Sequence, residues 1–234
     1  MQSFRRQFQQ KFFWVLTFAC FIHSLNTAVG EIFAYPLIKS IITKANRTVT
    51  LFNGSHYWGG QLKAEAERLH MSRGLKKNGE SRCYALILLC VSVAYYRQPL
   101  SITCLREDAK QNSNGCSAVA EDVINTALRT PNFWPLLRQV TRVEKPIMAC
   151  WSFSVAPEHC QKSMLEDDED AGFLAHAKEA FDRRFIKIAT PVHWLALFLH
   201  PPWRKLALSG DSAKGQGKSL NFMLNAAFKI AQQW

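Results

Sequence analysis

Prolines divide this chain into short apolar segments, and that division constrains its fold more than any other feature. Within segments such as Ala118–Thr130 and Ser219–Gln233, apolar side chains recur three or four positions apart. That spacing places them on one face of a helix. Proline breaks or bends a helix because it lacks the backbone N–H and its ring clashes with the preceding turn. The pattern therefore predicts a mainly α fold made of helices of moderate length.

Helical patterns cover most of the chain. Helices are expected over Ala19–Tyr35, Leu37–Phe52, Tyr57–Met71, Cys83–Tyr96, Ser101–Asp108, Ala118–Thr130, from Pro131 to a break or kink at Pro146, Ala171–Ile188, His193–Leu199 and Ser219–Gln233. Ser55 is expected to cap one of them, because a serine oxygen accepts a hydrogen bond from a free amide of the first turn. The acidic run Glu166–Asp170 is either a solvated loop or a favourable charge at a helix start. The aromatic and β-branched run Phe12–Phe18 instead predicts a short buried strand.

Composition places the chain among globular proteins. It has 234 residues, of which 48% are hydrophobic and 20% are charged, and a chain of this length buries a sizeable core without disulfides. No run of 18 uninterrupted apolar residues occurs, which argues against a multi-pass membrane protein. The seven cysteines include no Cys-x-x-Cys pair, so neither a zinc ribbon nor a thioredoxin motif is present, and reduced thiols in an intracellular protein are expected.

Positive charge is concentrated in the first half. Residues 1–100 hold 13 Lys and Arg against 4 Asp and Glu, whereas residues 101–234 hold 16 against 14. This asymmetry favours a polyanionic partner, with a basic surface kept for solubility as the alternative. One patch combines cations for phosphates with aromatic rings for bases: Arg73, Lys76, Lys77 and Arg82, near Tyr57 and Trp58. A solvated loop beside a core aromatic residue is the competing interpretation.

Two motifs suggest a bound group, and neither is complete. Cys20 and His23 share one face of the expected helix, but zinc requires four ligands and no matching pair follows. The stretch Ser212–Ser219 ends like a phosphate-binding loop, yet serine replaces its first glycine and no apolar strand precedes it. We therefore expect no metal site and no nucleotide site.

The first 30 residues resemble a secretion signal. Arg5, Arg6 and Lys11 precede an apolar run at 12–22 that only one threonine interrupts, and small residues follow. Two N-glycosylation sequons, at Asn46 and Asn53, are consistent with export. An apolar run this short is equally a core element of a folded domain.

Five blocks of sequence, in order, resemble transposases of the hobo–Activator (hAT) superfamily, especially fungal members. The blocks are Cys20–Asn26, Phe52–Trp58, Glu80–Cys83, Trp134–Pro146 and Leu197–Arg204. The first matches the family signature C-x-x-H-x-L-N through Cys20, His23 and Asn26. The second resembles F-x-x-S-H through Ser55 and His56, followed by Trp58.

The resemblance implies an RNase H-like catalytic core interrupted by a large helical insertion domain. Residues 1–35 would be a remnant of the core, and residues 36–234 would correspond to the insertion domain. The family cuts DNA with Mg²⁺ ions held by two aspartates and a glutamate, none of which the matching blocks supply. Arg82 matches a family arginine, but Cys83 stands where a tryptophan is usual and His200 where an aspartate is usual.

These observations predict a truncated transposase-derived protein without catalytic activity. The expected partners are DNA, bound weakly and without sequence preference, and full-length transposase relatives; no cofactor and no membrane partner are expected. The expected location is the nucleus. The alternatives are an exported or membrane-anchored helical protein that uses residues 12–22, and a helical module that binds other proteins.

Overall fold

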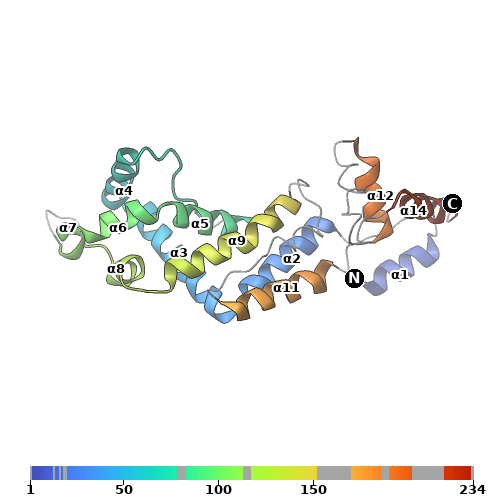
Figure 1. Ribbon diagram of the computed structural model, residues 1–234, viewed down its shortest axis with the longest axis horizontal. Helices are drawn as coiled ribbons and strands as arrows, with labels where there is room; N and C mark the ends of the chain where they lie inside the picture. Colours follow the sequence, from blue (N-terminus) through green and yellow to red (C-terminus); the bar gives the residue numbers. More distant parts are fainter. Residues whose placement is uncertain are drawn as a thin grey trace. The chain divides into compact units, whose positions relative to one another are not determined.

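The computed structural model of the chain is built from α-helices (Figure 1). It describes residues 2–12, 14–15, 17, 20–77, 83–112, 117–151, 170–185, 190–201 and 219–232. Helices account for most of these residues and none of them is in a strand, which confirms the mainly α prediction.

The helices keep the labels of Figure 1. Their bounds are α1 (Gln2–Lys11), α2 (Phe21–Phe33), α3 (Pro36–Gly54), α4 (His56–Arg68), α5 (Cys83–Tyr95), α6 (Arg97–Leu105), α7 (Glu107–Lys110), α8 (Glu121–Leu128), α9 (Phe133–Trp151), α11 (Ala171–Phe185), α12 (Pro191–Leu199) and α14 (Leu220–Ala231).

The strand expected over Phe12–Phe18 is absent at its described positions, 12, 14, 15 and 17. The backbone N–H of Phe12 instead donates to the carbonyl oxygen of Phe8 at 2.8 Å, which continues the hydrogen bonding of α1. Phe12, the first residue of the expected strand, follows Phe4 and Phe8 at intervals of four, which is a helical spacing. The strand prediction is therefore wrong at its described positions, and no edge of an RNase H-like sheet occurs among the described residues.

The chain divides into two compact units. Unit 1 comprises Met1–Ala28, Pro146–Leu165 and Lys178–Trp234, and unit 2 comprises Val29–Lys145 and Glu166–Ala177. The division expected between residues 35 and 36 rests on the family resemblance and stays a prediction.

Unit 2 has its core around α3 and α6. Helix α3 contacts α4, α5 and α8, and α6 contacts α4, α5 and α8 as well. The largest fully buried side chains of these helices are Phe52 and Ile38 of α3, Ile87 and Leu89 of α5, and Leu100 of α6. Burying such side chains stabilises the fold by roughly 1.5–3 kcal/mol each.

The α3–α4 corner is tight because of one glycine and one serine. A Cβ atom built on Gly59 would lie 2.5 Å from the carbonyl oxygen of Phe52, so only glycine lets the two helices approach this closely. The Ser55 oxygen accepts a hydrogen bond from the Trp58 backbone N–H at 3.1 Å and caps α4, as the sequence predicted.

Neither Pro99 nor Pro146 ends a helix. The helix break lies at Tyr96, and Pro99 falls in the first turn of α6, where no intrahelical N–H bond is lost. Likewise α9 continues past Pro146 to Trp151, so the break expected at that proline is wrong, and the alternative of a kink stays a prediction. Burial of the apolar face of α9 through Leu137, Val140 and Val143 compensates for the lost backbone bond.

The start of α11 is fixed within unit 2. The Asp170 carboxylate accepts a hydrogen bond from the Phe173 backbone N–H at 2.7 Å, which caps the helix. The Asp170 carbonyl oxygen accepts one from the Gln139 side-chain amide at 2.9 Å. This confirms a favourable acidic charge at the helix start for Asp170; residues 166–169 lie outside the described residues.

Unit 1 contains two helices that pack on each other, α12 and α14. Trp194 and Met223 are buried between the two helices, and Leu195, Phe198 and Phe222 pack around them. The Ser219 oxygen caps α14 by accepting a hydrogen bond from the Phe222 backbone N–H at 3.2 Å.

Among the described residues, no single helix has both the length and the apolar character needed to cross a membrane. One bent pair, Ala85–Tyr95 with Arg97–Leu105, meets the length and composition criteria together, with a bend of 60° between its halves.

Candidate nucleic-acid interface

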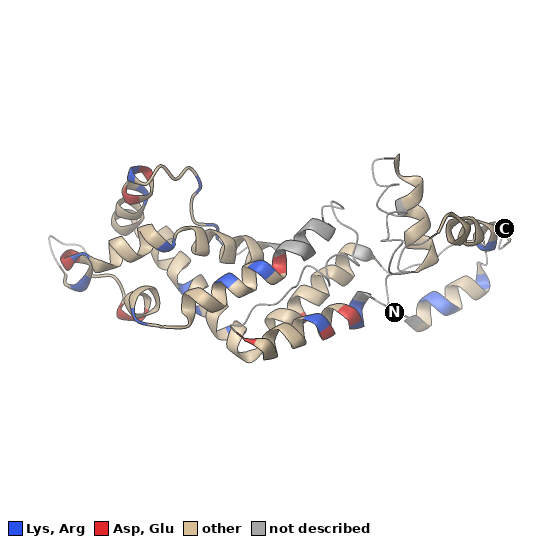
Figure 2. Cartoon of the chain, viewed as in Figure 1, with Lys and Arg blue, Asp and Glu red and all other residues tan. Residues whose placement is uncertain are grey.

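The exposed side chains that the structure describes on α9 carry only positive charge. Between Phe133 and Glu144, the side chains exposed to solvent are those of Arg138 and Arg142, which lie four residues apart on one face. The only acid in this stretch, Glu144, is buried. A solvated helix face normally alternates the signs of its charges, and like charges four residues apart destabilise a helix slightly. Figure 2 shows the Lys and Arg positions along α9.

A third cation extends this face toward the start of α9. The Arg97 guanidinium carbon lies 5.6 Å from the centre of the Trp134 ring, and Trp134 is one turn before Arg138. The Trp134 indole N–H donates to the Ala127 carbonyl oxygen at 2.9 Å, which fixes the ring. Stacking on a fixed ring orders Arg97 while its side chain stays exposed. We call Arg97, Arg138 and Arg142 the α9 basic stripe.

The predicted basic loop lies on α5. Its Lys76 backbone N–H donates to the Ser92 oxygen of α5 at 3.0 Å, and the Ser92 hydroxyl donates in turn to the Leu89 carbonyl oxygen. The side chains of Arg73, Lys76 and Lys77 are exposed. Three of the four predicted cations are therefore accessible on a segment whose backbone is fixed at one point, and Arg82 lies outside the described residues.

The aromatic residues expected beside that loop have structural roles. The Trp58 side chain is buried, and its indole N–H donates to the Ser117 carbonyl oxygen at 2.8 Å. The Tyr57 ring packs edge-on against Trp58, with 4.9 Å between the ring centres. Trp58 therefore offers no free face to a nucleic-acid base, and the competing interpretation of a core aromatic residue is the one the structure supports.

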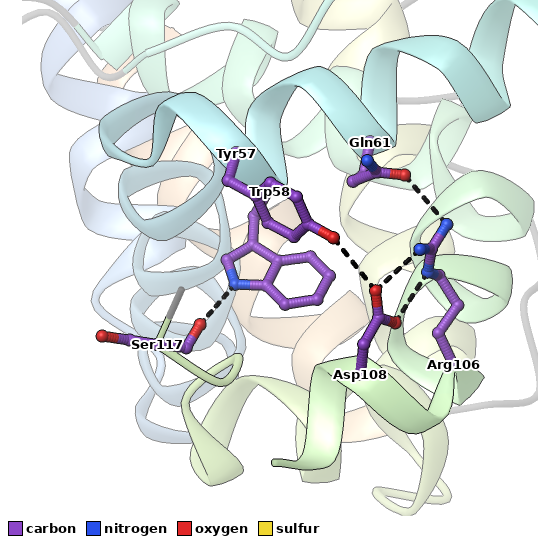
Figure 3. A network of polar contacts seen from close by, with 6 residues as sticks. All are labelled: Tyr57, Trp58, Gln61, Arg106, Asp108 and Ser117. Atoms are coloured by element: carbon purple, nitrogen blue, oxygen red, sulfur yellow. Dashed lines mark hydrogen bonds and ion pairs between the residues drawn. The ribbon is translucent and has the colours of Figure 1, made fainter. Parts of the chain in front are cut away.

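Tyr57 also belongs to a polar network that ties α4 to α7 (Figure 3). Arg106 donates from Nε and Nη2 to the two Asp108 oxygens, at 2.9 and 2.7 Å, and from Nη1 to Gln61 Oε1 at 2.9 Å. The Tyr57 hydroxyl donates to Asp108 at 3.1 Å. The Arg106 hydrogen bonds lower the pKa of the Asp108 carboxyl to about 2, and the Tyr57 bond contributes. Because its guanidinium group donates to Asp108, Arg106 is less available to a phosphate.

The remaining motif residues show no convergent chemistry. Cys20 and His23 are exposed at the start of α2, and the Asn26 side chain, three residues further on, is half-buried. His56 is exposed in the first turn of α4, next to the capping Ser55. Within the described part of the chain, no group of three or more His, Cys, Asp or Glu side chains is arranged to hold a metal ion.

Three of the described acids of unit 2 do not fit the Mg²⁺ site that the family resemblance implies. The carboxylates of Asp108, Glu107 and Asp122 are each paired with a cation, at 2.7, 2.9 and 3.0 Å. Two-metal chemistry needs carboxylates that converge on one point, and these lie on separate ion pairs. We therefore derive no step through a metal.

One buried acid is unlike the others. Glu144 is 1% exposed, and neither of its carboxyl oxygens has a hydrogen-bond partner. Burial raises its pKa well above the usual value, which favours the neutral carboxylic acid. Burial raises the pKa of the Cys90 thiol on α5, and a smaller electrostatic contribution from Glu144 indicates that the two groups lie near each other in the core.

Comparison with protein-family models, with curated proteins and with solved structures found no match for this chain. The hAT resemblance therefore rests on the five sequence blocks alone. The α9 basic stripe did not figure in the sequence analysis, although its signal was present. Arg138 and Arg142 occupy the polar side of a helix whose apolar side is formed by Leu137, Val140 and Val143.

Proposed function

We propose that unit 2 binds duplex DNA without sequence preference, through phosphate contacts of the α9 basic stripe and of the basic loop. The observation that carries this proposal is that the exposed side chains between Phe133 and Glu144 are arginines alone. Residues 36–145 hold 16 Lys and Arg against 8 Asp and Glu, whereas the rest of unit 2 adds six acids and no Lys or Arg. The excess of positive charge is therefore local to residues 36–145, where it attracts the phosphate backbone of nucleic acids within about a Debye length.

Arginine suits this role for two reasons. Its planar guanidinium donates two parallel hydrogen bonds to one phosphate group, and it is more weakly hydrated than a lysine ammonium. The Arg97 guanidinium is already ordered on Trp134, so less side-chain entropy is lost when it binds.

The test is the salt dependence of binding to a labelled duplex of about 25 base pairs. The affinity should fall linearly on a log–log plot against salt concentration, with a slope of about 0.9 per phosphate contact. The double variant R138Q/R142Q should reduce that slope by about 2 and weaken binding about equally on unrelated sequences. The triple variant R73Q/K76Q/K77Q measures the contribution of the loop in the same way.

The matched control is K63Q/K110Q, which removes the same net charge from unit 2. Lys63 and Lys110 already pair with Glu67 and Glu107, at 3.8 and 2.9 Å, so they should contribute less to phosphate binding. If K63Q/K110Q weakens binding as much as R138Q/R142Q, only the net charge matters and the stripe is not an interface. A slope unchanged in both arginine variants would exclude the proposal.

The relation to hAT transposases is a separate proposal, supported by the order and spacing of the five blocks. It is tested by sequencing the native transcript beyond both ends of this reading frame. Continuation into upstream aspartates and a downstream S-E-R-x-F block would support the family. Continuation into unrelated protein-coding sequence would argue against it.

We also propose that this chain does not cut DNA and acts in the nucleus. The support is that the matching blocks supply none of the family's three metal-binding carboxylates. Mg²⁺- or Mn²⁺-dependent cleavage of a plasmid by the purified chain, absent from a mock purification, would overturn the first statement. Exclusion of a C-terminal fluorescent fusion from the nucleus would overturn the second.

A further inference from the structure

Helix α1 in unit 1 has an exposed aromatic face. Phe4, Phe8 and Phe12 follow one another along one side, with 5.9 and 4.8 Å between successive ring centres, and Trp14 lies edge-on to Phe12 at 5.8 Å. The Phe4 side chain is 65% exposed and that of Trp14 is 52% exposed. Within unit 1, α1 makes no extensive contact with another described helix. Phe8 and Phe12 are half-buried, so the face is open to solvent mainly at Phe4 and Trp14.

A helix this short needs a surface to pack against. It has ten residues, and isolated helices shorter than about 12–15 residues are marginal in water because nucleation is costly. Its other side chains are mainly glutamines and cations, which do not supply a second packing face. The aromatic face is the part that a partner surface can cover.

The charges around this face indicate which kind of partner surface it can bind. Arg5, Arg6 and Lys11 are the charged residues before Glu31, so the segment carries positive charge with no acid to offset it. At 3.6 residues per turn, Arg5 and Lys11 lie at the two edges of the face that Phe4 and Phe8 occupy. Cations in these positions extend their long stems along apolar surface and place their charged ends at its boundary.

We propose that α1 lies flat on an anionic lipid surface, with Phe4, Phe8 and Phe12 in the acyl boundary and Arg5 and Lys11 among the headgroups. Aromatic residues favour this boundary, and basic helices with an aromatic face bind it in the plane. This goes beyond DNA binding by unit 2 and departs from the sequence expectation of no membrane partner. The chain contacts the lipid surface through a helix that lies on it.

Lipid suits this face better than nucleic acid does. A base inserted between two rings needs them roughly 7 Å apart, twice the ~3.4 Å rise between stacked bases. The centres of the Phe8 and Phe12 rings are only 4.8 Å apart, so they already pack on each other. A row of packed phenyl rings offers continuous apolar surface, which the phosphate surface of a duplex cannot bury.

The test is co-sedimentation of the full chain with large vesicles, of phosphatidylcholine alone or with about 30% phosphatidylserine. We expect binding to the anionic vesicles at least about tenfold stronger than to the neutral ones at 0.1 M salt. The variant F4S/F8S, which leaves the charge unchanged, should lose at least about tenfold of that binding. The control Q7S/Q10S, on exposed positions of the same helix outside the aromatic face, should bind like the wild type.

Each result decides the proposal. Equal binding by F4S/F8S and the wild type would overturn it, because the rest of this basic chain would then account for vesicle binding. Weakened binding of F4S/F8S to a single-stranded oligonucleotide, with vesicle binding unchanged, would overturn it in favour of nucleic acid. Release of bound protein by alkaline carbonate supports a helix on the surface, whereas retention would indicate an inserted segment. Because R138Q/R142Q leaves α1 intact, failure here is separate from failure of DNA binding by unit 2.

Discussion

The backbone of Gly59 in α4 approaches the Phe52 carbonyl oxygen of α3 so closely that a Cβ atom there would lie 2.5 Å from that oxygen. This distance is shorter than any ordinary contact, and the opposing atom belongs to the backbone, so relief requires the two helices to move apart. The neighbouring Gly60 has no atom within 4 Å of a Cβ position. Of these two adjacent glycines, Gly59 has no room for a side chain and Gly60 does.

We predict opposite signs for alanine at these two positions. Gly59→Ala should lower the free energy of unfolding by about 1–3 kcal/mol, because overpacking forces backbone shifts. Gly60→Ala should raise it by about 0.5–1 kcal/mol, because alanine loses less backbone entropy in a helix interior. Urea denaturation of both variants measures the difference. Equal effects of the two substitutions would show that the helices separate without cost.

The helices follow from local rules, whereas the contacts between them do not. The expected segments Leu37–Phe52 and Cys83–Tyr96 match α3 and α5 to within two residues at each end, because proline and apolar spacing act locally. Ser55 was identified as a cap for the same reason. The error at Phe12–Phe18 arose because the strand prediction rested on β-propensity, which depends strongly on tertiary context.

The candidate site was predictable only in part. Accessible cations at Arg73, Lys76 and Lys77 follow from a polar, glycine-containing segment. The burial of Trp58 depends on Ser117, which is 59 residues away in sequence, and no local pattern shows that pairing. The stacking of Arg97 on Trp134 is equally non-local. Long-range contacts therefore decide which aromatic residues remain available for binding.

The Asp108 network predicts a stability difference that depends on acid pH. Asp108→Asn removes the carboxylate that accepts from Arg106 and Tyr57, so it should lower the melting temperature at pH 7. The folded-state pKa of Asp108 is lowered to about 2, so its stabilising contribution is present above the ordinary value near 3.9. That contribution is lost as the pH falls toward 2. The difference in melting temperature between wild type and D108N should therefore narrow from pH 5 to pH 2.

The control for this network is Glu107→Gln, at the adjacent position of α7. Its carboxylate pairs with Lys110 at 2.9 Å but is 87% exposed, whereas the Asp108 carboxylate is 25% exposed. Exposed pairs contribute little, so E107Q should leave the melting temperature nearly unchanged. If E107Q and D108N lower the melting temperature equally, the hydrogen bonds from Arg106 to Asp108 stabilise the fold no more than an exposed ion pair does.

Glu144 predicts the opposite dependence on pH. Its pKa is raised in the folded state, so folding retains a proton that the unfolded chain releases above the ordinary carboxyl range. The stabilising effect of that proton is present at low pH and is lost as the pH rises toward the folded-state pKa. The free energy of unfolding should therefore fall as the pH rises above the ordinary carboxyl range.

Glu144→Met tests this directly. Replacing a buried polar group that has no hydrogen-bond partner with an apolar side chain should stabilise unit 2 by about 1–3 kcal/mol at pH 8, and by less at pH 5. Urea denaturation at both pH values measures the difference. The control is Glu67→Gln, whose carboxylate is 65% exposed and which should change neither value by more than about 0.5 kcal/mol. Destabilisation by E144M at both pH values would contradict a neutral, unpartnered carboxyl at this position.

The final prediction separates two explanations of Ser55, which belongs both to a helix cap and to a block that resembles a transposase motif. Ser55→Ala should lower the free energy of unfolding by about 1 kcal/mol, because the Trp58 backbone N–H loses its acceptor. Ser55→Asp should restore most of that stability, since a carboxylate accepts the same bond and favours a helix N-terminus. The control is Ser40→Ala on the exposed side of α3, which should be neutral or slightly stabilising because alanine favours a helix. Recovery by S55D would assign Ser55 to folding and leave the resemblance without support from this residue. If both variants lowered the free energy of unfolding, the serine hydroxyl itself would be required, and capping alone would not explain this residue.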